Sequence, residues 1–311
     1  DITVRILTEI ERVIAREEPD LVLVHGDTST TFVVALAAFY QKIKLAHIEA
    51  GLRTYNKYSP YPEEVNRHLT ATLADLHFAP TKKAKANLLQ ENISEEDILI
   101  TGNTVIDALL EVVDKDYQFK VPQLREIDFN KKIILLTTHR RENLGQPMKN
   151  IFSAVREIIK SNRDVEVVFP VHLNPKIRKL VKEILGDMER VHLIEPLTYK
   201  AFVNLMAKSY LVMTDSGGIQ EEAPSLAKPV LLLRDTTERP EALEARAVKL
   251  VATDKQKIIS MANNLLNDKI EYQTMANISN PYGDGQASQR ILQAILYFFA
   301  YEQKEPADFR L

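Results

Sequence analysis

Residues 209–229 read SYLVMTDSGGIQEEAPSLAKP, and this stretch decides the fold class. The apolar run Leu211–Thr214 predicts a buried strand, Ser216–Gly218 predict a tight turn, and a predicted helix begins at Ile219. Two glycines let a ligand approach the backbone closely, and a helix N-terminus offers free N–H groups and a positive dipole end. The stretch therefore predicts one strand–turn–helix unit of a parallel α/β sheet, with a diphosphate site at its turn.

The same alternation of short apolar runs and helical patterns extends over the rest of the 311 residues. Near-continuous apolar strands separated by helices are typical of parallel sheets that helices cover on both faces. We therefore predict an α/β protein with two Rossmann-like parallel-sheet domains. The predicted strands of the first domain are Leu21–Val24, Lys44–Ile48, Leu76–Ala79 and Ile98–Thr101, and those of the second are Ile133–Thr137, Val165–Pro170, Val191–Ile194, Leu211–Thr214, Val230–Leu233 and Val248–Val251.

A polar segment of mixed charge that contains a proline, Asp114–Lys132, separates the two series of strands. Such segments are typical of domain boundaries. We predict a first α/β domain over 1–113 and a second over 114–285. We expect a C-terminal helical segment over 286–311 to pack back on the first domain.

The composition excludes several classes of protein. Lysine and arginine total 40 and aspartate and glutamate total 43, so the formal net charge of −3 gives no bulk attraction to nucleic acid or anionic membranes. The absence of cysteine excludes disulfides, thiolate nucleophiles and cysteine-bound metals. No apolar run approaches the roughly 18 residues of a membrane-spanning helix, and no signal peptide is visible, so we expect a cytoplasmic protein.

The common nucleotide and metal motifs are also absent. No GxGxxG follows the first strand, no GxxxxGKS or GxxxxGKT occurs, and the histidines lack the HExxH spacing. A nicotinamide enzyme, a P-loop NTPase and a zinc enzyme are therefore not indicated.

Three acidic residues, Asp27, Glu49 and Glu63, follow strands of the first predicted sheet. Parallel strands bring such residues to one edge of the sheet, where ligands bind. Structural alternatives exist: Asp27 could cap the next helix, and Glu63 with Glu64 could complement the dipole of a helix that begins near Pro62. However, acids that converge on one edge repel one another and raise one another's pKa values, which favours a proton-transferring site.

The second predicted domain also places polar residues after its strands. His139 lies beside Arg140, a pairing that suits an anionic ligand, and His172 follows the next strand, where a plain loop histidine is an equal alternative. Glu222 lies one turn into the helix after the glycine turn, where it either complements the helix dipole or accepts the two hydroxyls of a ribose. Arg239 begins a further helix near the same edge.

A resemblance to a known family rests on nine motifs, which occur in the order HGDTSTT, HIEAGLRT, SPYPEEVNRH, TGNTVIDAL, THRREN, VHLNP, TDSGGIQEEAPSL, RDTTERPEAL and NPYGDG. They resemble the non-hydrolysing UDP-N-acetylglucosamine 2-epimerases over essentially the whole chain. The resemblance implies a homodimer with a glycosyltransferase-B-like fold and the nucleotide sugar in the interdomain cleft. It also implies C2 epimerisation of UDP-GlcNAc to UDP-ManNAc, which supplies ManNAc for bacterial cell-surface polysaccharides.

The resemblance also implies a mechanism and a set of residues. UDP is eliminated across C1–C2 of the sugar and added back from the other face, without a metal or a redox cofactor. The implied residues are, as catalytic groups, Asp27, Glu49, Glu63 and His139; as contacts to UDP, Phe202, Ser216, Gly217, Gly218, Glu222 and Arg239; and, beside a second, activating UDP-GlcNAc, Arg140 and His172.

The chain departs from the usual family pattern in two respects. It lacks an opening segment with a GTRPE motif, whose arginine and a nearby lysine the family places on the diphosphate, so we expect a truncated first domain. The family also usually has glycine where this chain has Arg246 and Ala252.

Alternative functions stay open at this point. One is a UDP-sugar glycosyltransferase of the same fold, and another is a nucleotide-sugar-binding fragment with little turnover. A third is a hydrolysing epimerase that releases ManNAc and UDP. Incubation with UDP-GlcNAc in the absence of an acceptor distinguishes an epimerase from the glycosyltransferase.

Overall fold

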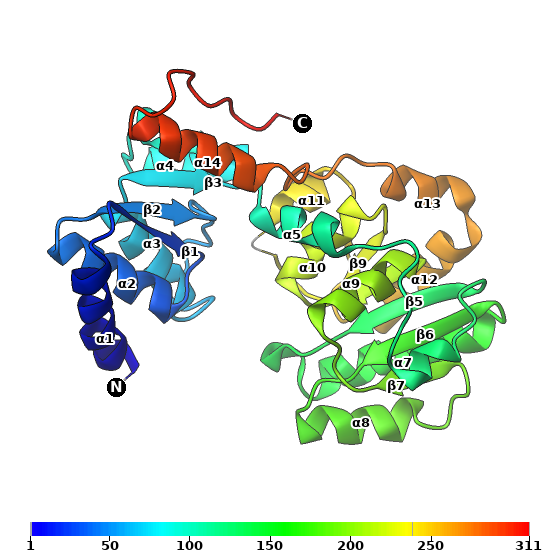
Figure 1. The fold of residues 1–311 in the computed structure, drawn as a ribbon. Coiled ribbons are helices and arrows are strands. Elements are labelled where there is room, and N and C mark those ends of the chain that lie inside the picture. The colour runs from blue at the N-terminus through cyan, green and yellow to red at the C-terminus, as the bar shows by residue number, and fades with distance from the viewer. Residues whose placement is uncertain (1, 238, 311) are drawn as a thin grey trace. The chain divides into compact units, whose positions relative to one another are not determined.

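The computed structural model describes residues 2–237 and 239–310, and it divides the chain into two compact units (Figure 1). Unit 1 consists of Asp1–Asp107 and Tyr282–Leu311, and unit 2 consists of Ala108–Pro281. The predicted boundaries after residues 113 and 285 lie a few residues beyond these divisions. At the first boundary the difference falls within one helix, because α5 (Thr104–Val112) contributes residues to both units.

Unit 1 is built on a four-stranded parallel sheet whose strands lie side by side in chain order. Its elements are α1 (Ile2–Glu17), β1 (Leu21–His25), α2 (Ser29–Tyr40), β2 (Lys44–Ile48), α3 (Glu63–Leu73), β3 (Leu76–Ala79), α4 (Lys82–Gln90), η1 (Glu95–Asp97), β4 (Ile98–Ile100), the start of α5, and α14 (Ala287–Phe298). Ile291 and Ala294 of α14 pack with Ala46 of β2 and Phe78 of β3, and Figure 1 shows this red helix lying along the sheet. Two distant parts of the chain therefore share one core.

Unit 2 is built on a six-stranded parallel sheet with the order β10-β9-β8-β5-β6-β7. Its elements after α5 are α6 (Pro122–Arg125), β5 (Lys132–Thr137), η2 (Arg141–Asn143), α7 (Gln146–Ser161), β6 (Val165–Pro170), α8 (Pro175–Leu185), β7 (Val191–Ile194), α9 (Tyr199–Lys208), β8 (Leu211–Thr214), α10 (Gly217–Ser225), β9 (Val230–Leu232), α11 (Pro240–Glu244), β10 (Val248–Leu250), α12 (Lys255–Asn267) and α13 (Lys269–Ala276). This is a doubly wound sheet: after β7 the chain returns to the centre and continues on the other side of β5. The switch point lies between β5 and β8, where Thr137 pairs with Thr214.

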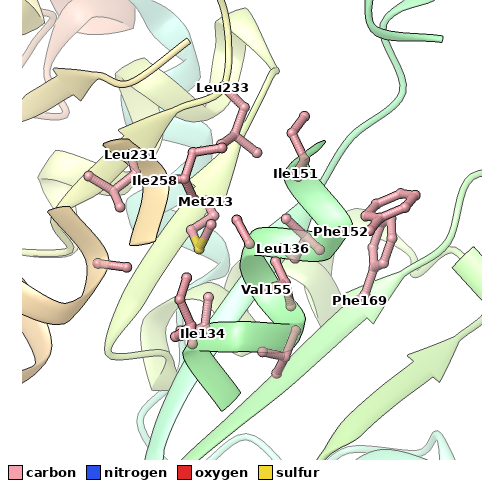
Figure 2. Packing of buried hydrophobic residues seen from close by; sticks show 14 of the residues in the cluster. Ile134, Leu136, Ile151, Phe152, Val155, Phe169, Met213, Leu231, Leu233 and Ile258 are labelled. Carbon is pink, nitrogen blue, oxygen red and sulfur yellow. The ribbon is translucent and has the colours of Figure 1, made fainter. Parts of the chain in front are cut away.

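The main core of unit 2 lies between one face of this sheet and the helices α7 and α12. Figure 2 shows Phe152 and Val155 of α7 beside Leu136 of β5 and Met213 of β8, all of them fully buried. The rings of Phe152 and Phe169 lie 5.7 Å apart, as tilted aromatic pairs do. This dense packing gives the ends of β5 and β8 a rigid base.

The predicted fold class is confirmed, because both sheets are parallel and all ten predicted strands occur within one residue of their predicted ends. The predicted start of one helix is wrong, since α10 begins at Gly217 and not at Ile219. Ser216 is the N-cap residue with extended backbone angles, φ −80° and ψ 137°, so both glycines already belong to the helix. The tight turn is therefore shorter than the predicted Ser216–Gly218.

Helix α11 is followed by a left-handed residue that is not glycine. Arg246 has a φ of +65°, and the N–H groups of Arg246 and Ala247 donate to the carbonyls of Leu243 and Ala242 at 3.0 Å each. This hydrogen-bonding pattern usually has glycine at the left-handed position, because a Cβ atom crowds the backbone there. The position is one of the two at which the family usually has glycine.

We expect Arg246→Gly to stabilise the chain. Relief of the left-handed strain gains about 1–2 kcal/mol, and the greater freedom of glycine in the unfolded chain costs about 0.4–1 kcal/mol. The free energy of unfolding, measured by urea denaturation, should therefore rise by up to about 1.5 kcal/mol. Arg246→Ala is the matched control: it keeps the Cβ atom and should leave the value unchanged. Equal stabilisation by both variants would contradict the backbone explanation.

Candidate functional site

Asp27 lies directly after β1, in a turn that begins with Gly26 at a φ of +71°. The alternative that Asp27 caps the next helix is wrong, because Thr28 is the N-cap of α2 and its side chain accepts the N–H of Thr31. Asp27 is therefore available for another contact. Its carboxylate accepts a hydrogen bond of 2.5 Å from Arg67 of α3.

Arg67 is buried between two carboxylates. Its Nη2 atom binds Asp27, and its Nη1 atom lies 3.5 Å from Glu64, one helical turn earlier on α3. Glu64 is itself buried, and it accepts the backbone N–H groups of Thr54 and Tyr55. The first turn of α3 therefore fixes both the loop after β2 and the carboxylate after β1.

The structure brings the three predicted acids to one edge of unit 1. Glu49 follows β2 with a φ of +64°, and its carboxylate lies 3.1 Å from His25 Nε2 at the end of the neighbouring β1. Glu63 is the first residue of α3. Burial raises the pKa of Asp27, Arg67 opposes this shift, and the charges of Glu49 and Glu63 add to it. The net result is a pKa above the usual value, which suits a group that exchanges protons.

Two neutral histidines lie beneath this edge. His47 of β2 is fully buried, and its Nε2–H donates to the carbonyl of Gly26 at 2.8 Å, in the turn that carries Asp27. His77 of β3 is almost fully buried. Burial lowers the pKa of each histidine to about 4, because a charged imidazole loses its hydration there.

In unit 2, His139 and Asp215 lie side by side at the switch point of the sheet. Asp215 follows β8 and is fully buried, and His139 follows β5 with a side chain that is 44% exposed. His139 Nδ1 lies 3.1 Å from Asp215 Oδ1. Open parallel sheets bind ligands at such switch points, because the loops on either side diverge there.

Arg140 and His172 lie beside the same pair. The rings of His139 and His172 are stacked, with centroids 6.2 Å apart and planes 22° apart. The N–H of Arg140 donates to Asp215, and its guanidinium lies 3.8 Å from Glu142. The structure thus brings together the three residues that follow β5 and β6.

The start of α10 is the second part of the unit 2 site. Ser216 caps this helix without a side-chain hydrogen bond to the first turn. One turn later, Glu222 is buried and accepts a hydrogen bond of 2.8 Å from the hydroxyl of Tyr199. Burial raises the pKa of Glu222, and the Tyr199 hydrogen bond acts in the opposite direction. Phe202 lies on α9, which also carries Tyr199.

Arg239 is connected to α10 through side chains. Its Nε atom donates to Glu221, the neighbour of Glu222. Its backbone N–H donates to Thr237, whose hydroxyl donates to Gln220 of the same helix. Arg239 is the N-cap residue of α11, so the contact with α10 fixes the start of that short helix.

The described residues show neither a metal-binding cluster nor a membrane-spanning helix. In residues 2–237 and 239–310, no group of three or more histidine, aspartate or glutamate side chains has a geometry that could bind a metal ion. In the described part of the chain, no helix has both the length and the apolar character that a bilayer crossing needs.

Comparison with known proteins decides the family. The family model described as UDP-N-acetylglucosamine 2-epimerase matches residues 1–296. The chain belongs to this family. The enzyme of this name from Bacillus subtilis strain 168 is 54% identical over 309 residues, a match that covers 99% of this chain and 80% of that protein.

Two solved structures are also similar to this chain. The structure of S. aureus MnaA with UDP has a TM-score of 0.95 and 51% identity, and the match covers 99% of this chain and 84% of that one. The UDP-GlcNAc 2-epimerase of Neisseria meningitidis, solved with UDP-GlcNAc, has a TM-score of 0.86 and 51% identity over 95% of this chain and 81% of that one. The expected epimerase family and its fold are therefore confirmed.

Several residues of this epimerase-family site did not emerge from the motifs. Arg67 lies three residues after Glu64 in SPYPEEVNRH, a spacing that places both on one helical face and was a usable signal. Asp215 directly follows the predicted strand Leu211–Thr214, but no motif assigned it a role. Tyr199 had no signal, because its contact with Glu222 joins two helices.

The two neutral histidines should make unit 1 sensitive to acid. Because their folded-state pKa of about 4 lies below the unfolded value, only the unfolded chain binds these protons as the pH falls. The stabilisation is complete above about pH 6.5 and decreases towards pH 4, by on the order of 3 kcal/mol for each histidine. Urea denaturation of the unaltered chain and of His47→Gln/His77→Gln at several pH values measures this loss.

The double variant should lose less stability between pH 6.5 and pH 4, because glutamine does not titrate. His172→Gln, which changes an exposed histidine, is the control and should follow the unaltered chain. If the free energy of unfolding fell equally with pH in the unaltered chain and the double variant, the low pKa values assigned to His47 and His77 would be wrong.

Proposed function

We propose that this chain catalyses the reversible C2 epimerisation of UDP-N-acetylglucosamine to UDP-N-acetylmannosamine. The observation that carries the proposal is the group of three carboxylates at one edge of unit 1, with the pKa of Asp27 raised. Family membership and the 54% identity to the Bacillus subtilis 2-epimerase support it. The UDP and UDP-GlcNAc in the two similar structures support the identity of the substrate.

Elimination and re-addition account for the inversion at C2. The C2 proton is not adjacent to a carbonyl, so simple deprotonation is very unfavourable. In our proposal a base removes this proton while the C1–O bond breaks, and UDP leaves with the electron pair. The product, 2-acetamidoglucal, then accepts a proton on the opposite face of C2 as UDP adds back to C1. Carbon is neither oxidised nor reduced overall, so the proposed reaction needs no redox cofactor, and we propose that it uses no metal.

Asp27, Glu49 and Glu63 are the proposed proton-transfer groups, with His139 as a fourth functional group. A carboxyl with a raised pKa retains a proton nearer to neutral pH, as a general acid must. The three charges interact, so base and acid are not assigned to individual residues. Arg67 restrains Asp27 and balances part of the negative charge at this edge.

The start of α10 is the proposed site for UDP. The helix start at Ser216, Gly217 and Gly218 is suited to a diphosphate, because a helix N-terminus stabilises anions; the N–H of Ser216 itself donates to the hydroxyl of Thr214. Glu222 accepts the ribose hydroxyls, and Arg239 and Phe202 complete the contacts. Gln220 and Thr237 support this assignment, since they connect Arg239 to the helix that carries Ser216.

We extend the proposal to regulation and assembly. Arg140 and His172 bind a second UDP-GlcNAc that activates the enzyme, and the active form is a cytoplasmic homodimer. The stacking of His172 on His139 supports the first part, because a ligand on one ring would alter the position of the other.

Turnover in deuterated water tests the reaction. The UDP-ManNAc formed from UDP-GlcNAc should carry deuterium at C2, because the carboxyl groups exchange the abstracted proton with solvent. Asp27→Asn, Glu49→Gln and Glu63→Gln should each lower kcat by about 10²–10⁴-fold, the usual contribution of acid–base catalysis. Glu95→Gln, which changes an exposed acid of the same unit, is the control.

NMR of the product gives the deuterium content, and calorimetry gives the affinity for UDP, which the three variants should leave nearly unchanged. Complete retention of the original hydrogen would refute elimination. Release of free ManNAc would instead indicate a hydrolysing enzyme, and no reaction without an acceptor would favour a glycosyltransferase.

Tyr199→Phe tests the UDP site. It removes the hydrogen bond to Glu222, and a hydrogen bond to a charged group contributes about 1.5–3 kcal/mol. The carboxylate then loses part of its orientation and charge, so the Kd for UDP, measured by calorimetry, should rise about tenfold. Tyr272→Phe removes one hydrogen bond elsewhere in unit 2 and should leave the Kd unchanged. An equal effect of both substitutions would mean that Glu222 does not contact the nucleotide.

A further inference from the structure

Asp215 is surrounded by hydrogen-bond donors from the turn after β5. Its carboxylate accepts the N–H groups of His139 and Arg140, the hydroxyl of Thr138 and the amide of Asn143, at 2.9–3.1 Å. The side chain has no exposed surface. A buried carboxylate with this many donors remains ionised, since every contact favours the charged form.

The electrostatics agree with this geometry. Burial alone would raise the pKa of Asp215, but the hydrogen bonds from His139, Arg140 and Thr138 outweigh it and hold the pKa below its usual value. An ionised carboxylate can only accept hydrogen bonds. The nitrogen of His139 that faces Asp215, Nδ1, must therefore carry a proton.

This contact determines the state of the other ring nitrogen. With Nδ1–H donated to Asp215, the Nε2 atom of the neutral ring has a free lone pair, and in the charged ring it is a donor. Only a ring held in this tautomer and orientation can use Nε2 as an acceptor when the ring is neutral and as a donor when it is charged. His139 lies at the switch point of the sheet and is 44% exposed, so a ligand can approach it.

We propose that Asp215 is the positioning residue for His139: it fixes the Nδ1–H tautomer and the ring orientation, and thereby presents Nε2 to the nucleotide sugar. The inference rests on the proposed function only for the identity of that ligand. Asp215 contacts no substrate in this proposal and acts through His139. The role is separate from that of the neighbouring Ser216–Gly218, which bind the diphosphate.

The variant Asp215→Asn should reverse the tautomer. Oδ2 faces Thr138, Arg140 and Asn143, so the amide oxygen of the new side chain should take that position. Its NH₂ group then faces His139 Nδ1 and can only donate, which requires the proton to move to Nε2. The same change in a carboxylate–histidine pair of a serine protease lowers kcat by about 10⁴-fold. We expect a loss of about 10³-fold in kcat with little change in KM.

Nitrogen-15 NMR of the histidine rings measures the tautomer directly, and His139→Gln identifies the signals of His139 by their disappearance. In the unaltered chain, Nδ1 should stay protonated over the whole pH range in which the chain is folded. In Asp215→Asn, Nε2 should carry the proton of the neutral ring. Neither of these two NMR measurements depends on turnover of a substrate.

Thr138→Val is the matched control, because it removes one donor to Oδ2 but leaves the contact between Oδ1 and His139. It should preserve the tautomer and nearly all of kcat. Asp215→Asn should have no further effect in a His139→Gln background, since residues that act as a unit are not additive.

Four results would overturn the proposal. They are an unprotonated Nδ1 in the unaltered chain, an unchanged tautomer or kcat in Asp215→Asn, an equal loss in Thr138→Val, and full additivity with His139→Gln. If Asp215→Asn does not fold, the tautomer of His139 in the unaltered chain still tests the proposal. Absence of any turnover on UDP-GlcNAc would contradict the proposed function instead, while the NMR measurement would still test the positioning role.

Discussion

An ionised carboxylate without water around it must find all its partners within the chain, and Asp215 is such a group. Its donors come from Thr138–Asn143, the turn that follows the neighbouring strand β5. Because burying an unpaired charge is very costly, the turn after β5 can take few other paths. The positions of His139 and Arg140, and the stacking of His172 on His139, all depend on this one buried charge.

In unit 1, several carboxylates lie close together and need a compensating positive charge. Its edge collects negative charge from Asp27, Glu49 and Glu63, and the buried cation of Arg67 compensates part of it. Arg67 also contacts Glu64, which accepts two N–H groups of the loop after β2. One guanidinium thus connects the acid after β1 to the loop after β2. Removal of this buried cation would take away the positive charge that faces both carboxylates.

Both sheets have polar residues at their C-terminal edges and mostly apolar strands below them. In unit 2 the core between the sheet and α7 and α12 is fully buried, so the ends of β5 and β8 have little freedom to move. In unit 1 the neutral His47 supports the turn of Asp27 from beneath. Reactive groups that are placed on rigid elements in this way keep their geometry during a reaction.

The type and order of the elements, and the edge on which the polar residues lie, can be predicted from sequence pattern. Buried parallel strands are continuous apolar runs, and the residue after each run must lie at the C-terminal edge, so both follow from local pattern. The nine motifs also indicated the family, because their order along the chain is specific to it. Where a helix begins is less certain from sequence, as the start of α10 at Gly217 shows, because the backbone angles of Ser216 are decided by its surroundings.

Contacts between side chains that are distant in the sequence depend on the folded structure. Arg67 contacts Asp27 across 40 residues, Asp215 contacts the backbone of His139 across 76, and Tyr199 contacts Glu222 across 23. A hydrogen bond tolerates an error of only a few tenths of an ångström, whereas sequence pattern places a residue on a face or at an edge. The pKa values of Asp27 and Asp215 depend on burial and on these contacts, and they differ in direction although both residues follow a strand. The two carboxylates look alike in the sequence, but their surroundings raise the pKa of Asp27 and lower that of Asp215.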